Sequence, residues 1–472
     1  MDARASDEIV RLSAREQARR IRVGAVSVRE IVEAHLDRID RVNPAVNALV
    51  TVDHEGALSR AEELDRGGQE GVLRGLPVAI KDLARTKGMR TTLGYTGFAD
   101  NVPDADDLQV ARIRDAGAVL VGKSNTPAFA AGSHTVNALF GATRNPHALD
   151  RSAGGSSGGA AAALAAHLVP LADGSDMGGS LRNPASFCGV VGLRPTPGVI
   201  PTRDAPNAFN PLITTGPMAR DVRDLALLLR AEAGSYGAEP RGVDLTGSAL
   251  EDVRPIGAGG LRVAYAPTLG GRIPVDDEVR AVLDRVAARL DDAGAVIEAD
   301  CPDLDGADEA FRTIRQSEAA AALEGIARTA PERLPDFLLD EVRRGQARTA
   351  ADVARAYAET TRLLRAAESF FDGYDLVLAP TAQVPPFPVE QDWVHEVAGV
   401  PQGDYLEWMQ AAYLFTPLGI PGISIPAGWS AEGTPIGVQL LARARQDVAL
   451  VRMAAGIEDV LAVPIRDLFA TG

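Results

Sequence analysis

The sequence predicts an α/β fold, in which strands and helices alternate along the chain and pack in layers. Short apolar runs typical of buried strands recur between longer segments whose apolar residues repeat at helical spacing. Such interleaving of strands with long helices is typical of layered α/β domains. The chain has 472 residues, of which 46% are hydrophobic and 24% charged, so it is long and apolar enough to bury a large core.

The N-terminal half is predicted to start with a helical segment over about residues 1–45. Ser27 and Glu30 have the spacing of a capping box, and Asn43-Pro44 is expected to end the helix that follows. Residues 125–155 have little regular pattern. The other predicted elements are a strand at 46–52, a helix at 57–64, a strand at 77–80, a helix at 106–116, a strand at 118–121, a helix at 158–168 and a strand at 169–172.

The C-terminal half repeats this alternation. A strand is predicted at 261–265, a helix at 279–290 and a strand at 295–297. Residues 232–260 and 382–391 are rich in Gly, Pro or polar residues, which is typical of surface loops. The first would connect the two halves, and the second is a candidate rim of a pocket.

Charge and cysteine content exclude several classes of partner. The formal net charge of -16, with no cluster of basic residues, opposes binding to nucleic acid or to anionic membranes. Only Cys188 and Cys301 occur, so a disulfide framework is not expected. No stretch has the apolar core of a signal peptide or the length to span a bilayer. We therefore expect a soluble, cytoplasmic monomer or homodimer that binds a small molecule.

Two motifs match known patterns in an unsuitable context. Residues 117–124 fit the phosphate-loop pattern, but the residues between the glycines are strand-forming where an open loop is needed. Residues 154–158 fit the nucleophile elbow, but a polar, irregular stretch precedes them, and only His395 lies downstream of His167 as a base. The six histidines are scattered, so we predict neither a metal nor a cofactor.

Two glycine–serine loops form the densest unusual feature, at residues 151–159 and 173–185, on either side of one predicted helix–strand unit. Glycines let backbone N–H groups point into a site without side chains in the way. Such loops could bind a phosphate, stabilise an oxyanion or be two flexible turns. Lys81 lies at the end of a buried strand in the same half. Lysine can replace histidine as the base of a serine enzyme.

In these motifs the sequence resembles the amidase-signature family. Gly-Gly-Ser-Ser-Gly-Gly stands at 154–159, and the family's second block stands at 174–185. Further matching segments occur in the family's order at 75–82, 122–127, 141–146, 374–381, 419–427 and 435–440. The resemblance implies a large mixed central β-sheet covered by helices on both faces. It also implies one domain over residues 1–472, with a signature core at about 70–225 and a half at about 260–472 that completes the sheet and the substrate pocket.

The resemblance also implies three catalytic residues. Ser180 would be the nucleophile, Ser156 the bridging serine that is usually held by a cis peptide bond, and Lys81 the base. Accepting a proton near pH 7 requires Lys81 to be neutral, so its pKa must fall about three units below the usual ~10.4. Burial behind the glycine loops is expected to cause this decrease.

Other residues receive supporting roles from the same resemblance. The backbone N–H groups of Met177, Gly178, Gly179 and Ser180 are expected to stabilise the oxyanion, and the carbonyl of Ala130 to face the substrate amide. Asp176 and Arg182 are interpreted as the scaffold of the second loop, and Cys188 as a buried thiol. Substrate contacts are expected from residues 129–140, 203–212 and 383–414.

The implied activity is hydrolysis of the C–N bond of a small neutral amide through an acyl-enzyme. Esters, ureas and carbamates (urethanes) use the same route, and the residues do not choose among these substrates. Two alternatives remain open. One is a component like that of the glutamyl-tRNA amidotransferases, which works with partner subunits. The other is a catalytically silent binding or scaffold protein. Departures from the family pattern include Ala153, Ser175, Pro197 and Thr416-Pro-Leu-Gly.

Overall fold

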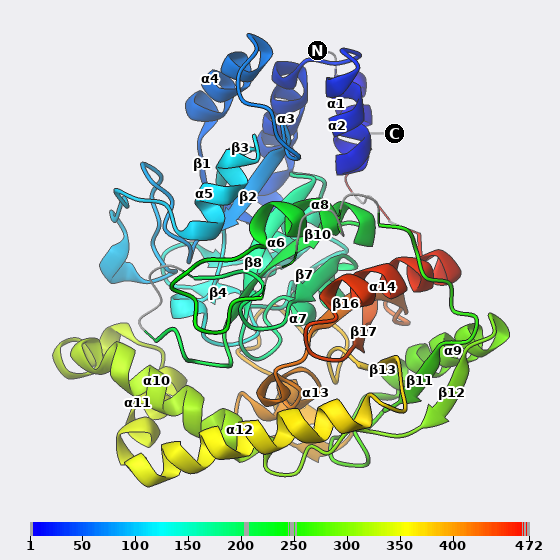
Figure 1. Ribbon diagram of the computed structural model, residues 1–472. Helices are drawn as coiled ribbons and strands as arrows, with labels where there is room; N and C mark the ends of the chain where they lie inside the picture. The colour runs from blue at the N-terminus through cyan, green and yellow to red at the C-terminus, as the bar shows by residue number, and fades with distance from the viewer. Residues whose placement is uncertain are drawn as a thin grey trace.

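An 11-stranded β-sheet runs through the centre of the computed structural model, which describes residues 3–202, 207–243, 245, 250, 253–464, 466 and 469 (Figure 1). Its first strand along the chain begins at Leu49 and its last ends at Leu441, so both halves contribute to one sheet. The strand order is β1 (Leu49–Val52), β3 (Val119–Ser124), β2 (Pro77–Lys81), β8 (Leu171–Asp176), β10 (Thr214–Ala219), β9 (Val191–Arg194), β16 (Gly422–Trp429), β17 (Pro435–Leu441), β13 (Leu376–Pro380), β11 (Arg262–Tyr265) and β12 (Val296–Ala299).

The sheet is mixed, as predicted. β2 is parallel to both β3 and β8, and β11 is parallel to both β12 and β13. The other neighbouring pairs are antiparallel. Three small two-stranded sheets accompany it: β4 (Val136–Asn137) with β5 (Gly141–Ala142), β6 (Arg144–Asn145) with β7 (Ala148–Ser152), and β14 (Glu396–Val397) with β15 (Val400–Pro401).

Helices cover both faces of the central sheet, which confirms the predicted α/β class (Figure 1). One apolar core lies between the sheet and α5, α8, α9 and α14, and another lies between the sheet and α3 and α6. α10 packs against both α11 and α12. The helices are α1 (Ala3–Arg11), α2 (Ala14–Arg22), α3 (Val28–Val46), α4 (His54–Asp65), α5 (Leu108–Asp115), α6 (Gly158–Ala165), α7 (Arg182–Cys188), α8 (Val222–Glu232), α9 (Asp277–Asp292), α10 (Ala307–Thr329), α11 (Asp336–Ala347), α12 (Ala350–Phe370), α13 (Gln410–Tyr413) and α14 (Asp447–Leu461).

The alternation of side chains along β2 fixes the direction of Lys81. Val78 and Ile80 belong to the core under α5 and α8, whereas Ala79 belongs to the core under α6. Successive side chains of a strand point to opposite faces, so the side chain of Lys81 lies on the same face of the sheet as that of Ala79. The lysine is therefore directed toward the N-terminus of α6, where the first glycine–serine loop ends.

The predicted end of the third helix was wrong. Ser27 and Glu30 do form the capping box, but α3 continues through Pro44 to Val46. A proline in the last turn removes one backbone hydrogen bond and leaves the rest of the helix intact. The helix ends where Asn47 adopts a left-handed conformation, and the side chain of Asn43 accepts the next two backbone N–H groups.

β8 extends beyond its predicted end at residue 172 and runs to Asp176. All six of its residues pair with β10 in register, from Leu171 opposite Ala219 to Asp176 opposite Thr214. This pairing with a strand distant in sequence overrides the low strand propensity of Gly174. The second loop is therefore shorter than predicted and is anchored directly to the sheet.

The two stretches predicted to be surface loops differ from each other in the structure. In the stretch 232–260, residues 244, 246–249, 251 and 252 lie outside the described residues, and Glu232 is the buried last residue of α8. The stretch 382–391 is largely buried, with Phe387 packed against Trp408. None of its residues lines the cavity that contains Ser156 and Ser180, so this stretch does not form a rim of that cavity.

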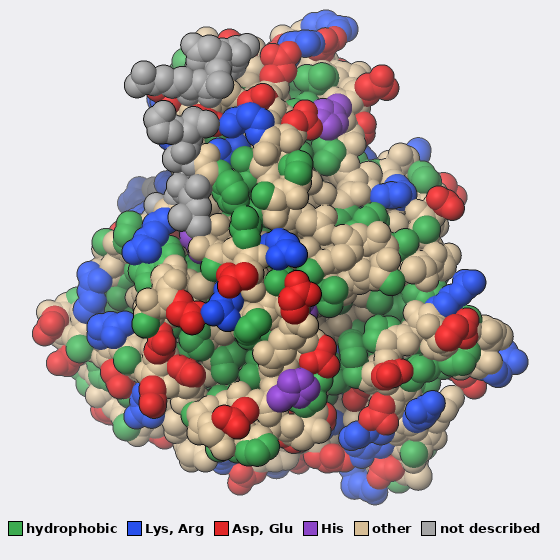
Figure 2. All heavy atoms as spheres, turned by 180° about the vertical axis from the view of Figure 1, so that it is seen from behind, with side chains coloured by type: hydrophobic (Ala, Val, Ile, Leu, Met, Phe, Trp, Pro, Cys, Tyr) green, Lys and Arg blue, Asp and Glu red, His purple; other side chains and the backbone are tan. Residues whose placement is uncertain are grey.

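Basic and acidic side chains are interspersed on the face drawn in Figure 2, and the described side chains form no broad basic patch there. Along the described residues, no helix combines the length and apolar character needed to cross a lipid bilayer.

Candidate active site

One cavity contains both glycine–serine loops. It has a volume of about 330 Å³, and Ser156 of the first loop and Ser180 of the second line it. The backbone N–H of Ser157 donates to the carbonyl of Ser180 at 3.2 Å, which ties the loops together. The Gly155–Ser156 peptide bond is cis. Two of the three residues predicted to be catalytic thus share one cavity.

The amine of Lys81 joins this cluster through serine hydroxyls. Its Nζ lies 2.8 Å from Ser156 Oγ, 2.9 Å from Ser157 Oγ and 3.0 Å from Ser175 Oγ. The contacts of Ser157 and Ser175 with the lysine were not predicted. A signal was present for Ser175, because it lies in the second glycine–serine loop, which the family resemblance groups with Lys81 in one site.

Burial controls the protonation of Lys81. The side chain is almost fully buried, and this desolvation lowers the pKa of Lys81 to about 7, against the opposing effect of the Asp173 and Asp176 carboxylates. A neutral amine has two N–H donors and one lone pair, so it can satisfy three neighbouring hydroxyls. A lysine with this pKa is partly neutral near pH 7, as a general base must be.

Asp176 organises the second loop. Its carboxylate accepts the backbone N–H of Gly179 at 2.9 Å and that of Leu181 at 3.2 Å. Arg182 donates to both carboxylate oxygens, at 2.9 and 3.0 Å, and Arg194 donates to the carbonyl of Asp176. These two cations hold the pKa of Asp176 well below its usual range, despite complete burial. The network agrees with the interpretation of Asp176 and Arg182 as a scaffold.

This scaffold narrows the set of candidate oxyanion donors. The N–H of Gly179 already has an acceptor in Asp176. Among the described residues, the N–H groups of Met177, Gly178 and Ser180 have no hydrogen-bond acceptor. Met177 is held in place because its carbonyl accepts the hydroxyl of Thr416 at 2.8 Å. Thr416, which departs from the family pattern, therefore helps to fix Met177 in the second loop.

We predict that Arg182→Met lowers the free energy of unfolding by about 3–5 kcal/mol, because removing one partner of a buried ion pair leaves an uncompensated charge. Both Arg182 and Asp176 have fully buried side chains. Arg182 also donates to the carbonyl of Ala412 and to Gln439 Oε1, so these acceptors lose their donor as well. Urea denaturation followed by circular dichroism measures the change.

Arg344→Met is the matched control, because Arg344 pairs with Asp340 at 2.7 Å on the surface of α11, and both side chains are about half exposed. A surface pair of this kind contributes about 0.3–0.5 kcal/mol. Equal effects of the two substitutions would contradict the structural role assigned to the buried pair.

The cavity walls come partly from predicted segments. Phe129 and Ala130 line the cavity, and both have positive φ angles. From the second predicted segment, 203–212, Asn207 and Asn210 line the cavity. Residues 203–206 of this segment lie outside the described residues. The third predicted segment, 383–414, contributes none of the described lining residues.

Helices α10 and α11 supply the wall that the sequence did not reveal. Their lining residues are Arg315, Glu318, Ala319, Ala322, Leu323 and Leu338. The predicted segment 383–414 lies behind this wall, where Tyr413 stacks on Phe311 of α10. Nothing in the local pattern of α10 distinguishes a helix that lines a cavity from one that packs on a core.

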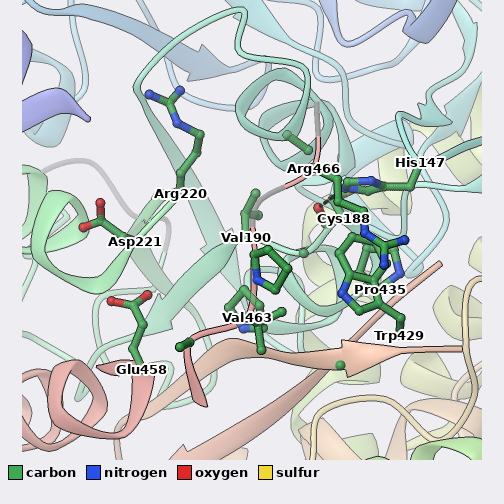
Figure 3. A pocket seen from close by; sticks show the side chains of 16 residues that line it. His147, Cys188, Val190, Arg220, Asp221, Trp429, Pro435, Glu458, Val463 and Arg466 are labelled. Atoms are coloured by element: carbon green, nitrogen blue, oxygen red, sulfur yellow. Dashed lines mark hydrogen bonds between the residues drawn. The ribbon is translucent and has the colours of Figure 1, made fainter. Parts of the chain in front are cut away.

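A second cavity, of about 210 Å³, contains a cysteine, a histidine and carboxylates, but its geometry does not support catalysis (Figure 3). His147 Nε2 lies 3.1 Å from the backbone carbonyl of Cys188, while the thiol donates to the carbonyl of Ala153. Burial raises the pKa of the Cys188 thiol far above its ordinary value. Figure 3 shows Glu458 and Asp221 grouped apart from His147 and Cys188. Cys188 is thus a buried thiol, as expected.

The two deceptive motifs also have structural explanations. Lys123 of the phosphate-loop pattern is a buried residue of β3 whose amine donates to Ala84 O and Thr86 Oγ1. The stretch before the elbow pattern was expected to be irregular, but it contains β7, which pairs with β6. His395, the possible base for this pattern, is about half exposed, pairs with Asp392 and does not line the cavity that contains Ser156.

The mixed α/β fold and the lysine–serine cavity place the chain in the amidase class of enzymes. The family model described as Amidase matches residues 30–451, and the chain belongs to the amidase-signature family.

Several relatives and solved structures align along most of the chain. An acylamidase of Rhodococcus erythropolis is 37% identical over 459 residues, which cover 95% of each chain. A glutamyl-tRNA(Gln) amidotransferase subunit of Alkaliphilus metalliredigens is 33% identical, with 93% of this chain and 94% of that protein covered. A bacterial aryl acylamidase superposes with a TM-score of 0.87 at 27% identity, covering 95% and 96%. The 6-aminohexanoate cyclic dimer hydrolase superposes with a TM-score of 0.85 at 30% sequence identity, and the alignment covers 96% of this chain and 97% of that chain.

Proposed function

We propose that the protein hydrolyses the C–N bond of small neutral amides through an acyl-enzyme on Ser180. The observation that carries the proposal is the 2.8 Å contact between Lys81 Nζ and Ser156 Oγ, next to the cavity that Ser180 also lines. Neutral Lys81 takes the proton of Ser156, and Ser156 takes that of Ser180. The Ser180 oxygen then attacks the substrate carbonyl carbon.

The charge that develops on the carbonyl oxygen is stabilised by backbone N–H groups of the second loop. Met177, Gly178 and Ser180 are the proposed donors, and each such donor is typically worth about 3 kcal/mol in the transition state. When the tetrahedral intermediate collapses, Ser156 returns a proton to the leaving nitrogen, which departs as a neutral amine. Water then repeats the cycle on the acyl ester and releases a carboxylic acid.

The cavity walls favour an apolar substrate. Phe129, Leu323 and Leu338 line the cavity together with several alanines. Apolar walls with a few convergent polar groups are typical of small-molecule sites. We therefore propose aryl or alkyl amides as substrates, with related esters and carbamates as further candidates that use the same acyl-enzyme.

The test is intact-mass spectrometry after treatment with a serine-directed fluorophosphonate, together with hydrolysis of a panel of aryl amides, esters and carbamates. We expect one adduct on the wild-type chain, no adduct on Ser180→Ala and turnover of at least one amide. Folded protein that forms no adduct and cleaves nothing would overturn the proposal.

The expected pH dependence follows from the pKa of Lys81, which burial lowers to about 7. Only the neutral amine accepts a proton. We predict that kcat/KM rises about tenfold per pH unit below pH 7 and levels off above it. Steady-state kinetics of amide hydrolysis from pH 5 to 9 checks this profile. A rate that falls as the pH increases through 7 would rule out a neutral lysine as the base.

A second candidate function is that of the corresponding component of a glutamyl-tRNA amidotransferase, because relatives with that name are 33% identical or more over nearly the whole chain. Such a component works with partners, so the purified chain would form the adduct on Ser180 but cleave no aryl amide. Turnover of aryl amides by the purified chain alone favours the amidase.

A further inference from the structure

Glu318 is a carboxylate at the cavity wall that has no cationic partner among the described residues. Its hydrogen-bond donor there is the neutral side-chain amide of Asn207, whose Nδ2 lies 2.6 Å from Glu318 Oε1. Both residues line the cavity, and both are partly exposed. Asn207 is also fixed, because its Oδ1 accepts the backbone N–H of Phe209 at 3.1 Å.

The two arginines of the same cavity are already paired. Arg315 Nε lies 3.2 Å from Glu341, and Arg241 Nε lies 3.3 Å from Glu239. Each arginine is therefore neutralised by its own carboxylate, and Glu318 remains as the uncompensated charge of the described lining. A carboxylate against apolar walls is stabilised by a cation or by a strong N–H donor.

The position of Glu318 along α10 sets its distance from the reacting carbonyl. Phe311, on the same helix, lies close to Gly178 of the second loop. Arg315 follows one turn later and contacts the sulfur of Met177 at 3.3 Å. Glu318 lies two turns beyond Phe311, which is about 10 Å along the helix axis. An alkyl chain of several methylene groups spans such a distance.

We propose that Glu318 is a specificity-determining residue that selects amides bearing a terminal ammonium group, several methylene groups away from the scissile carbonyl. The apolar side chain of Phe129 in the cavity wall would hold the chain, and the carboxylate of Glu318 would bind the charged end. This inference rests on the proposed function, and it extends the substrate class from neutral amides to amides that carry a positive charge at the far end of the chain.

The binding test needs no catalysis. In Ser180→Ala protein, calorimetry compares 5-aminopentanamide with pentanamide. A partly exposed, charge-assisted contact predicts about five- to thirtyfold tighter binding of the amino compound. Adding Glu318→Gln, which keeps the acceptor of Asn207 and removes the charge, should abolish the preference. Equal affinities, no binding of either compound, or a preference that survives Glu318→Gln would overturn the inference.

The kinetic test uses the p-nitroanilides of 5-aminopentanoic and pentanoic acid. In otherwise wild-type protein, Glu318→Gln should remove the preference in kcat/KM for the amino anilide over the uncharged anilide. Glu324→Gln is the control, because Glu324 is exposed on the same helix and does not line the cavity. Absence of both hydrolysis and labelling of Ser180 would reject the proposed function, whereas the binding preference decides the role of Glu318 separately.

Discussion

Replacing Ser180 by alanine is expected to lower kcat/KM for every amide that the protein cleaves by about 10⁴- to 10⁶-fold. The loss is large because the proposed acyl-enzyme forms on Ser180, and without it the rest of the site contributes only binding and oxyanion stabilisation. The fold should persist, because Ser180 is only partly buried and the loop is held through Asp176. Steady-state assays with chromogenic anilides measure the rate of hydrolysis, and thermal unfolding verifies that the variant is folded.

Ser369→Ala is the control for this substitution. Ser369 lies exposed near the end of α12 and does not line the cavity, so both activity and fluorophosphonate labelling should equal those of the wild type. If Ser180→Ala kept more than a tenth of the wild-type activity, Ser180 would not be the nucleophile, and Ser156 would be the next residue to examine.

Lys81→Met is expected to lower kcat/KM by about 10²- to 10⁴-fold, which is the usual contribution of a general base. Methionine has a similar length and no proton-accepting nitrogen, so the loss reports the chemistry of the amine. The variant should lose about 1–3 kcal/mol of stability, because the hydroxyls of Ser156, Ser157 and Ser175 lose the amine as a hydrogen-bond partner. The pH dependence centred near 7 should also disappear from the residual activity.

Lys123→Met is the matched control. Lys123 is as deeply buried as Lys81, and burial lowers its pKa to about 8, but its amine contacts Ala84 O and Thr86 Oγ1 and not the cavity. Its replacement should cost about 1–3 kcal/mol of stability through the acceptors left unpaired, and folded protein should keep its activity and pH profile. Similar kinetic losses in both variants would mean that a buried lysine supports the fold and is not the base.

Local sequence pattern predicted most of the elements that position the site. β2 and α6 match expected segments, because the apolar runs and the alanine-rich stretch have clear periodicities. The end of α3 and the length of β8 were missed, since a side-chain cap from Asn43 decided the first and pairing with β10 decided the second. The error at β8 arose because pairing with a strand distant in sequence overrode local propensity.

The sequence by itself determined the family, the glycine–serine loops and the identity of Lys81, Ser156 and Ser180 as candidates, because these are properties of residue order. Only the tertiary structure decided which hydroxyls surround the lysine, since Lys81 and Ser175 lie far apart in the chain and meet when β2 pairs with β8. Burial, and with it the decrease in the pKa of Lys81 to about 7, is likewise a result of packing. Only the tertiary structure likewise showed that Glu318 has no counterion among the described residues, because counterions are assigned by distance in space.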